Sequence, residues 1–488
     1  MLVNSRYIRW GGARRIRSGK SLLAAGFAVL PLVVAVLTLT AATSPPRNNL
    51  ASYHIPAFAR KYRTSCSTCH TAAPKLNVLG EAFRLNGYRF PENDALLRKD
   101  DPVPLGTEEW RDLWPRAIPP GEVPDAVPLA VRIINDLQFT NAPANESSLN
   151  FRFPEEVYLL GGATLGQNFG TFLELEWKRD LGVELLQAKV AVQDVLPWLP
   201  PRSWNLWVGL QNLYLFTYAD RQIDRAGKLK FLWQEFRVSS LQLSDPVPGT
   251  TIESTNGFSL GMTQPAVEMN GLLGGRFYYG LGVSQGAGGG TTDNNARKDV
   301  YYKLRYKFGG LGLDGRYGDN VPARVGWGGQ LFDRTVIVEQ FAYFGAEPVD
   351  GGLQDNHRSL GINVRTIVDR LDAGLGYVWS RNDNPWGSTV AGEVTTWSAF
   401  SKVEYLLYPW LIGSLKFDIL ESDLPPSATS GGQNGDVTLS RILPGLVMLL
   451  RQNIRGVIEA EVFTEYAPRA TVTEPTPNAL WIRLDLAF

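Results

Sequence analysis

The stretch Val300-Tyr301-Tyr302-Lys303-Leu304-Arg305-Tyr306-Lys307-Phe308 decides the fold. Its even-numbered side chains are apolar or aromatic, and its odd-numbered side chains from residue 303 onward are Lys or Arg. Successive side chains of a strand point to opposite faces, so this segment has one apolar and one charged face. Its length suits a tilted strand that crosses an outer membrane, which takes about 9–11 residues.

The same alternation recurs from about residue 129 to the end of the chain, for example at 173–178, 411–419 and 458–462. A soluble β-sandwich alternates as well, so loop lengths and the last strand must decide. Short turns are expected at Gly309-Gly310 and Asp369-Arg370, and long polar loops at 284–297, 347–356, 382–391 and 422–436. Outer-membrane barrels have this asymmetry of turns and loops. The last strand places Leu480, Ile482, Leu484, Leu486 and the terminal Phe488 on one face.

These patterns predict a mainly β fold, a large antiparallel transmembrane β-barrel over residues 129–488. Sixteen strands are favoured and 18 are the alternative, because bacterial single-chain barrels have even numbers. The candidate strands are odd in number, so at least one is wrong. They include starts near 228, 256, 271, 311 and 323, and we expect the error within 238–271. The predicted location is the bacterial outer membrane.

The N-terminus has the pattern of an export signal. Residues 1–42 contain six basic residues and no acidic one, and residues 22–39 are rich in Leu, Val and Ala. This pattern predicts a signal peptide cut near Ala42, with an uncleaved anchor as the alternative. Removing six of the 48 basic residues leaves 42 against 48 acidic ones, a net charge of −6. The chain has no basic block elsewhere, so a nucleic-acid partner is not expected.

Both cysteines of the chain lie in Cys66-Ser67-Thr68-Cys69-His70. CxxCH is the attachment motif of a c-type haem. Two thiols on one turn add to the porphyrin vinyl groups, and the adjacent His becomes the proximal ligand of the iron. A redox disulfide would need a thioredoxin-like context, and a zinc site would need more ligands than His54. We therefore expect one covalent haem c, held by Cys66, Cys69 and His70.

A short helix is expected between Pro74 and Gly87, with Leu76, Leu79 and Phe83 as its apolar stripe. The sixth iron ligand is not fixed by the sequence. His54 is the nearest imidazole and is the candidate distal ligand. The alternative is that His54 is a surface or linker histidine without a role in binding. Lys61, Lys75, a Met from the body of the chain or an open site are the other choices.

The chain thus divides into a signal peptide (1–42), a monohaem cytochrome c segment (43–100), a Pro-rich connector (101–128) and an outer-membrane barrel (129–488). The haem segment is too short to bury a haem well alone, so we expect it to dock in the barrel mouth or lumen. One haem carries one electron. This combination suggests electron transport across the membrane between an external one-electron donor and a periplasmic cytochrome or copper protein.

The residues 55–60, the motif itself, Pro74-Lys75-Leu76-Asn77 and residues 80–88 resemble the fused monohaem cytochrome–porins of the bacterial outer membrane. The best-known members of that family are iron oxidases. The resemblance implies an iron:cytochrome c oxidoreductase-type activity, with electrons passing from extracellular Fe(II) to periplasmic carriers. It assigns haem attachment to Cys66 and Cys69 and proximal ligation to His70, and it matches no site for the iron substrate.

Three other functions fit the same parts. The first is a haem-bearing porin without redox turnover. The second is the same conduit run outward, as a reductase of external acceptors. The third is a sheath around a separate multihaem cytochrome, which the attached haem disfavours. The sequence alone decides neither the donor nor the direction of electron flow.

Overall fold

The computed structural model of the chain describes residues 57–91, 94–99, 128–141, 148–165, 168–217, 231–238, 256–286, 296–316, 333–349, 352–387, 392–423, 437–467 and 478–488, and four two-residue strands. The expected signal peptide and His54 lie outside the described residues, as does most of the connector. Among the described residues, no helix is both long and apolar enough to span a membrane.

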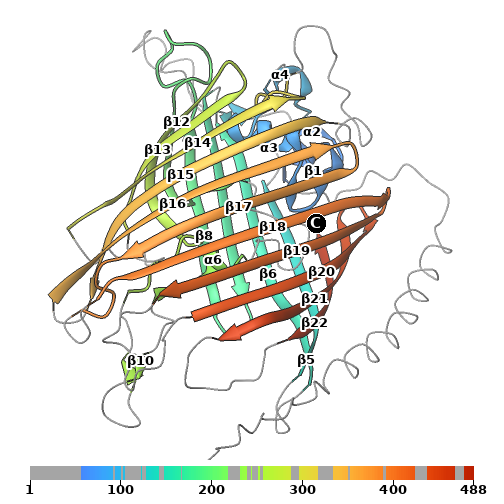
Figure 1. Cartoon of the computed structure of the whole chain (residues 1–488). Helices are drawn as coiled ribbons and strands as arrows, with labels where there is room; N and C mark the ends of the chain where they lie inside the picture. Colours follow the sequence, from blue (N-terminus) through green and yellow to red (C-terminus); the bar gives the residue numbers. More distant parts are fainter. Residues whose placement is uncertain are drawn as a thin grey trace, which may run out of the picture.

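Sixteen antiparallel strands form one closed barrel, and the last strand pairs with the first (Figure 1). The expected number and arrangement of strands are confirmed. The strands are β5 Leu129–Thr140, β6 Leu149–Leu165, β7 Phe169–Lys178, β8 Gly182–Val192, β9 Asn205–Asn212, β12 Thr263–Leu273, β13 Phe277–Ser284, β14 Asp299–Gly309, β15 Arg334–Val349, β16 Leu353–Val368, β17 Leu371–Asn382, β18 Val394–Tyr408, β19 Leu411–Asp423, β20 Val437–Arg451, β21 Ile454–Ala467 and β22 Ala479–Ala487.

Some expected strands and turns are wrong. The candidate strand near 228 belongs to the connection between β9 and β12, and residues 311–316 form turns that follow β14. The expected start near 323 lies outside the described residues. Gly309-Gly310 is therefore no hairpin turn, because the next strand begins only at Arg334. The long loop expected at 347–356 is also wrong, since β15 runs to Val349 and β16 begins at Leu353.

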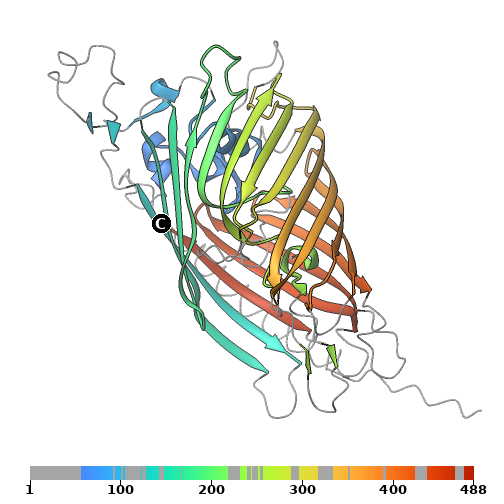
Figure 2. The same ribbon diagram turned by 90° about the vertical axis from the view of Figure 1, so that its left-hand side faces the viewer.

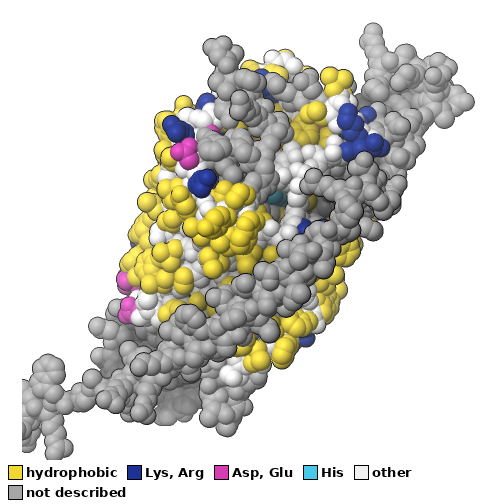
Figure 3. All heavy atoms as spheres, turned by 90° about the vertical axis from the view of Figure 1, so that its right-hand side faces the viewer, with side chains coloured by type: hydrophobic (Ala, Val, Ile, Leu, Met, Phe, Trp, Pro, Cys, Tyr) yellow, Lys and Arg dark blue, Asp and Glu magenta, His cyan; other side chains and the backbone are white. Residues whose placement is uncertain are grey.

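The two faces of the wall differ as the alternation requires. On β14, Val300 is 47% exposed and faces outward, while Lys307 is 1% exposed and faces the lumen. Hydrophobic side chains cover much of the outer wall (Figure 3). An apolar outer band and a polar interior are the signature of an outer-membrane barrel, so the chain is an outer-membrane β-barrel protein.

The two ends of the barrel have different connections. Because the strand number is even, Leu129 and Ala487 lie at one end, together with the short turns 369–370, 409–410 and 452–453. Most of the long connections, 213–262, 285–298, 424–436 and 468–478, lie at the other end, and one, 310–333, lies with the short turns. Short turns are periplasmic and long loops extracellular in such barrels. The end that holds the start of β5 and the end of β22 is therefore the periplasmic mouth, the upper end in Figure 2.

The residues before the barrel fold into small elements at that mouth. They are α2 Ala57–Tyr62, the 3-10 turn η1 Cys66–Thr68, β1 His70–Ala72, β2 Lys75–Leu76, α3 Val78–Leu85 and α4 Asp94–Leu97. Figure 2 shows these helices inside the upper end of the barrel. We call residues 57–91 the mouth segment. The expected helix is present but shorter than predicted, because Leu76 belongs to β2 and the helix begins at Val78.

The connection between β9 and β12 folds into the lumen from the opposite end. Its described parts, 213–217 and 231–238 with the short helix α6 Leu232–Glu235, are called the inserted loop here. Phe216 packs edge-on against Phe341 of β15, with ring centroids 4.8 Å apart. Phe231 stacks on Phe400 of β18 at 3.9 Å. The inserted loop therefore spans the lumen and narrows it.

Candidate functional site

A large cavity separates the mouth segment from the inner wall of the barrel. It holds about 1360 Å³ of empty space, including the solvent at its opening. Cys66, Cys69 and His70 all line it. Most of the other lining side chains are apolar or aromatic, and the opposite wall comes from β5, β6, β7 and the end of β22. The structure thus brings the three residues of the motif together at one cavity that segment and barrel share.

The attachment motif is held in a tight turn. The Cys69 backbone N–H donates to the Cys66 carbonyl at 3.2 Å, which closes η1. Asn77 fixes the turn from outside, because its side-chain amide donates to the carbonyls of Ser67 at 3.2 Å and Thr68 at 3.1 Å. The same side chain accepts from the Gly80 N–H at 2.9 Å and so caps α3. One residue thereby fixes the motif relative to the helix that follows it.

Gly80 allows α3 to lie directly against the motif. A Cβ at this position would lie 2.0 Å from the Cys69 carbonyl oxygen, far inside van der Waals contact. Gly162 on β6 plays the same part across the cavity, where a Cβ would lie 2.4 Å from the Phe58 ring. Glycines with this property mark places where one backbone must approach another group closely.

The two thiols are not activated. Burial raises the pKa of the Cys69 thiol to about 12, and the neighbouring Cys66 adds to this effect. Burial also raises the pKa of Cys66. Redox-active CxxC pairs need the opposite shift. The environment therefore does not favour a dithiol catalyst, one of the two alternatives to haem attachment.

Aromatic side chains pack one side of the cavity. Phe58 meets Phe83 edge-on at 5.1 Å and stacks on Tyr88 at 5.6 Å. Tyr88 in turn stacks on Phe172 of β7 at 5.4 Å. These rings join α2, α3 and the barrel wall in one apolar cluster. The sequence indicated only Phe83 of this set, because the other rings are brought together by tertiary packing.

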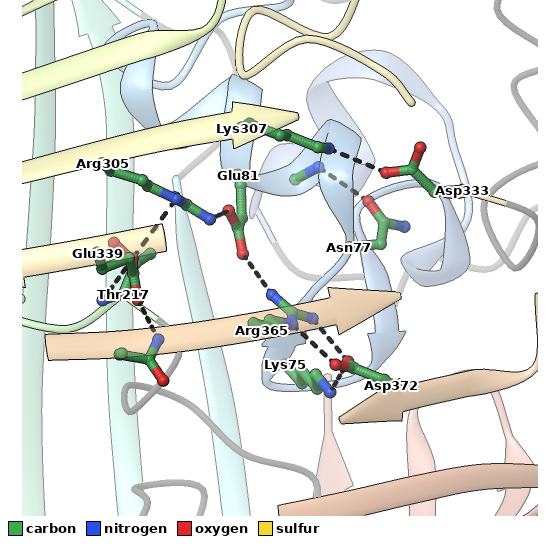
Figure 4. A network of polar contacts seen from close by, with 12 residues as sticks. Lys75, Asn77, Glu81, Thr217, Arg305, Lys307, Asp333, Glu339, Arg365 and Asp372 are labelled. Carbon is green, nitrogen blue, oxygen red and sulfur yellow. Dashed lines mark hydrogen bonds and ion pairs between the residues drawn. The ribbon is translucent and has the colours of Figure 1, made fainter. Parts of the chain in front are cut away.

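Ion pairs fix the mouth segment to the wall. Glu81 of α3 contacts Arg305 of β14 at 2.5 Å and Arg365 of β16 at 3.3 Å (Figure 4). Burial by itself would raise the pKa of Glu81, but Arg305, Arg365 and Arg84 together lower it to about 2. The carboxylate is thus held in its charged form between the guanidinium groups.

A second anchor lies beside the first. The ammonium of Lys75 contacts Glu404 of β18 at 2.5 Å and also pairs with Asp372 of β17. Asp372 further accepts from Arg365, which links the two anchors into one network (Figure 4). Sequence reasoning missed this network. Inward charges on alternating strands were visible, but their partners in the mouth segment were not.

The candidate distal ligands are separated by the structure. His70 lines the cavity, whereas His54 is outside the described residues. Lys75 is engaged by two carboxylates, and the Lys61 ammonium donates to Thr164. Among the described residues that line the cavity there is no Lys or Met. The geometry therefore disfavours Lys61, Lys75 and a Met as the sixth iron ligand. His54 and an open site remain predictions.

A binding site for an iron substrate was not predicted from the sequence. Within the described ranges, no group of three or more His, Cys, Asp or Glu side chains is arranged to hold a metal ion.

No protein-family model and no curated protein matches the chain. Solved structures do. The outer membrane channel DcaP of Acinetobacter baumannii matches with a TM-score of 0.50 and 10% sequence identity, over 75% of this chain and 97% of that chain. An anion-selective porin from Comamonas acidovorans matches with a TM-score of 0.47 and 12% identity, over 74% of this chain and 98% of that chain.

At such identities the likeness concerns the fold alone. The share of this chain that the DcaP structure covers is close to the share taken up by residues 129–488. This agrees with the closed barrel as the conserved architecture and leaves the mouth segment as the part that must be explained by its own residues. The chain has the fold of an outer-membrane porin, with a CxxCH segment seated in its periplasmic mouth.

Proposed function

We propose that the protein is an outer-membrane electron conduit. It takes single electrons from an extracellular reductant, with Fe(II) as the favoured donor, by way of one c-type haem to periplasmic carriers. This is an iron:cytochrome c oxidoreductase-type activity. The observation that carries the proposal is the cavity lined by Cys66, Cys69 and His70 between the mouth segment and the barrel wall.

The residues at the cavity fit a haem. Cys66 and Cys69 would hold it by thioether bonds, and His70 would be the proximal ligand of its iron. The lining of the cavity is predominantly apolar, as is usual for a cofactor site. The tight turn holds both thiols on the same side of the segment, at the cavity. When bound, a haem supplies reversible one-electron chemistry at this position.

The protein's own residues give that position its properties. Arg84 and Arg132 line the cavity among the apolar side chains, and Arg132 is already bound by Asp485. A guanidinium at this position would pair with the propionates of a bound haem. The aromatic cluster around Phe58 and Tyr88 limits the access of water. Glu81 and Lys75 keep the segment docked, so that the motif stays at one depth in the wall.

The lumen supports a conduit better than a diffusive porin. The mouth segment occupies the periplasmic end, and the inserted loop crosses from β9 to the rings of Phe341 and Phe400. Both elements narrow the lumen, which suits a barrel that does not pass large solutes freely. An external electron donor would have to enter the lumen to reach the cavity, because one haem at the periplasmic end does not span the hydrocarbon layer of roughly 25 Å.

The test is a redox titration with Fe(II) on the purified full-length protein. We expect covalently bound haem in the wild type and its reduction by Fe(II). His70→Ala should alter the haem spectrum and abolish this reduction. Ser67→Ala is the matched control within the same turn and should behave as wild type.

Other outcomes would identify the alternatives. Unchanged reduction in His70→Ala would contradict the proposed ligation. Covalent haem that neither Fe(II) nor a periplasmic carrier reduces or oxidises would indicate a haem-bearing porin without turnover. A haem potential low enough to reduce external acceptors, with no reduction by Fe(II), would indicate the same conduit run outward.

A further inference from the structure

We propose that the periplasmic mouth carries a docking surface for the acidic face of a small redox carrier protein. This inference rests on the proposed function and names the chemistry of its inward partner. The surface, called the basic rim here, consists of five cationic residues around the haem-attachment turn: Arg60, Arg63, Lys99, Arg370 and Arg451.

Three of these residues belong to the chain within or beside the mouth. Arg60 lies in α2, and Arg63 follows α2 directly, one residue before the cavity-lining Thr64 and Ser65. Arg63 is exposed and adopts a left-handed backbone conformation with φ of 46°. Lys99, also exposed, is tied to α2 by a hydrogen bond from its backbone N–H to the Lys61 carbonyl at 2.9 Å.

The other two come from the wall and border the same turn. Arg370 is exposed in the β16–β17 turn and lines a small pocket together with Thr71, which directly follows His70. Arg451 is exposed at the end of β20, two residues before the cavity-lining Asn453. The rim therefore surrounds the attachment turn from both the segment and the barrel.

Acidic groups at this mouth are already engaged in the part of the chain that the structure describes. Asp94 accepts from the Tyr62 hydroxyl at 2.7 Å. Asp369 pairs with Arg334 at 3.4 Å. Glu81 is paired with Arg305, and Asp372 is paired with Arg365. The described surface around the opening is consequently positive, and Lys and Arg side chains gather toward the upper end of the molecule in Figure 3.

The position of the rim favours a protein partner over lipid. Arg60, Arg63 and Lys99 belong to chain that precedes the barrel, whereas membrane lipid contacts the outer wall. A positive rim also disfavours Fe(II) as the ligand at this end. Complementary charge would guide an acidic carrier to the opening and orient its redox centre toward the attachment turn.

The experiment compares two double variants of the full-length haem-loaded protein in detergent. Arg63→Glu with Lys99→Glu reverses two charges of the rim. Arg297→Glu with Lys298→Glu makes the same change among exposed residues at the extracellular end and is the matched control. The probes are plastocyanin, as an acidic carrier, and its copper-free form, which cannot accept electrons.

Binding of copper-free plastocyanin is measured by calorimetry at low and high salt. We expect the rim variant to weaken Kd on the order of tenfold at low salt, with the difference lost at high salt, and the control variant to match wild type. Electron transfer from chemically reduced haem to copper plastocyanin should slow by a similar factor. Reduction of the haem by Fe(II) should remain unchanged in both variants.

The two proposals fail in different ways. If Fe(II) does not reduce the wild-type haem, the proposed function fails, and the calorimetry still decides the docking surface. Equal Kd values in all three proteins would overturn the docking surface. So would a rim variant that loses adhesion to phosphatidylglycerol vesicles and keeps its affinity for plastocyanin, since the rim would then be a lipid contact.

Discussion

The mouth segment and the inserted loop both fill the lumen, but they are held by different forces. The mouth segment is fixed through buried charges, with Glu81 and Lys75 contacting four residues of the wall. The inserted loop is fixed through rings, with Phe216 and Phe231 against Phe341 and Phe400. A charged interface specifies one position and is sensitive to pH and to loss of a partner. An aromatic interface contributes area and geometry without any dependence on protonation.

The largest expected effect is the loss of the central anchor. Glu81→Ala leaves Arg305 and Arg365 buried and without their shared carboxylate, so docking of the mouth segment should weaken by about 3–5 kcal/mol. Hydrogen exchange of the α3 amides measures this, for example the Asn86 N–H that donates to Ala82. Glu465→Ala, an exposed carboxylate on β21, is the control. A loss under about 1 kcal/mol would mean that the rings, and not the charges, hold the segment.

The inserted loop should respond to removal of a ring. Phe231→Ala removes a fully buried side chain that stacks on Phe400, which should cost about 3 kcal/mol of loop docking. The Leu232 amide donates to Asp418 at 3.0 Å and is the exchange probe for this loop. Trp198→Ala, at a position 75% exposed, is the control. If α3 amides lost protection as well, the mouth segment and the inserted loop would be coupled. The two regions would then not be held independently.

The pH dependence should separate the two regions. The folded pKa of Glu81 is lowered from its usual 4.5 to about 2, so its charge stabilises docking above pH 4.5. That contribution, about 3 kcal/mol, is lost as the pH falls from about 4.5 toward 2. Protection of α3 amides from exchange should therefore decline in this pH window. In Glu81→Gln this protection should depend less on pH. Protection of the Phe236 amide of the inserted loop, which donates to the Leu232 carbonyl at 2.8 Å, should depend less on pH in the same samples.

The smallest effect concerns close packing. Gly162→Ala places a methyl group 2.4 Å from the Phe58 ring, so α2 must shift at a cost of about 1–2 kcal/mol. Gly257→Ala is the matched change, because nothing lies within 4 Å of its Cβ. Hydrogen exchange of the α2 amides, measured as the temperature rises, shows how easily the mouth segment is released in each of the two variants. Equal behaviour of the two variants would show that the mouth segment adapts to its wall.

The sequence predicted the barrel well because its signal is periodic. Alternation along each strand depends only on the strand itself, and the even-number rule showed that at least one candidate was wrong. The error was expected within 238–271, and this was wrong, because surplus candidates lie near 228 and 311. The wrong elements have a physical cause. The described residues 213–217 and 231–238 of the β9–β12 connection include apolar side chains that pack inside the lumen, and the sequence from 231 onward therefore resembled a strand.

The candidate site was predictable only in part. Cys66, Cys69 and His70 follow from a local motif, and the structure places all three at one cavity. The anchoring roles of Glu81 and Lys75 were not predicted, because each acts through partners that are hundreds of residues away in the chain. Such pairs leave no local pattern. Unmatched inward charges near the ends of neighbouring strands, such as Arg305 and Arg365, were the available signal.

The seam of the barrel has a consequence for biogenesis. Ala130 and Arg132 of the first strand and Ala487 of the last strand line the cavity, and these two strands pair to close the cylinder. The final pairing event and the completion of the cavity are thus one step. Under the proposed function, we expect haem attachment to Cys66 and Cys69 to depend on whether this seam is still open.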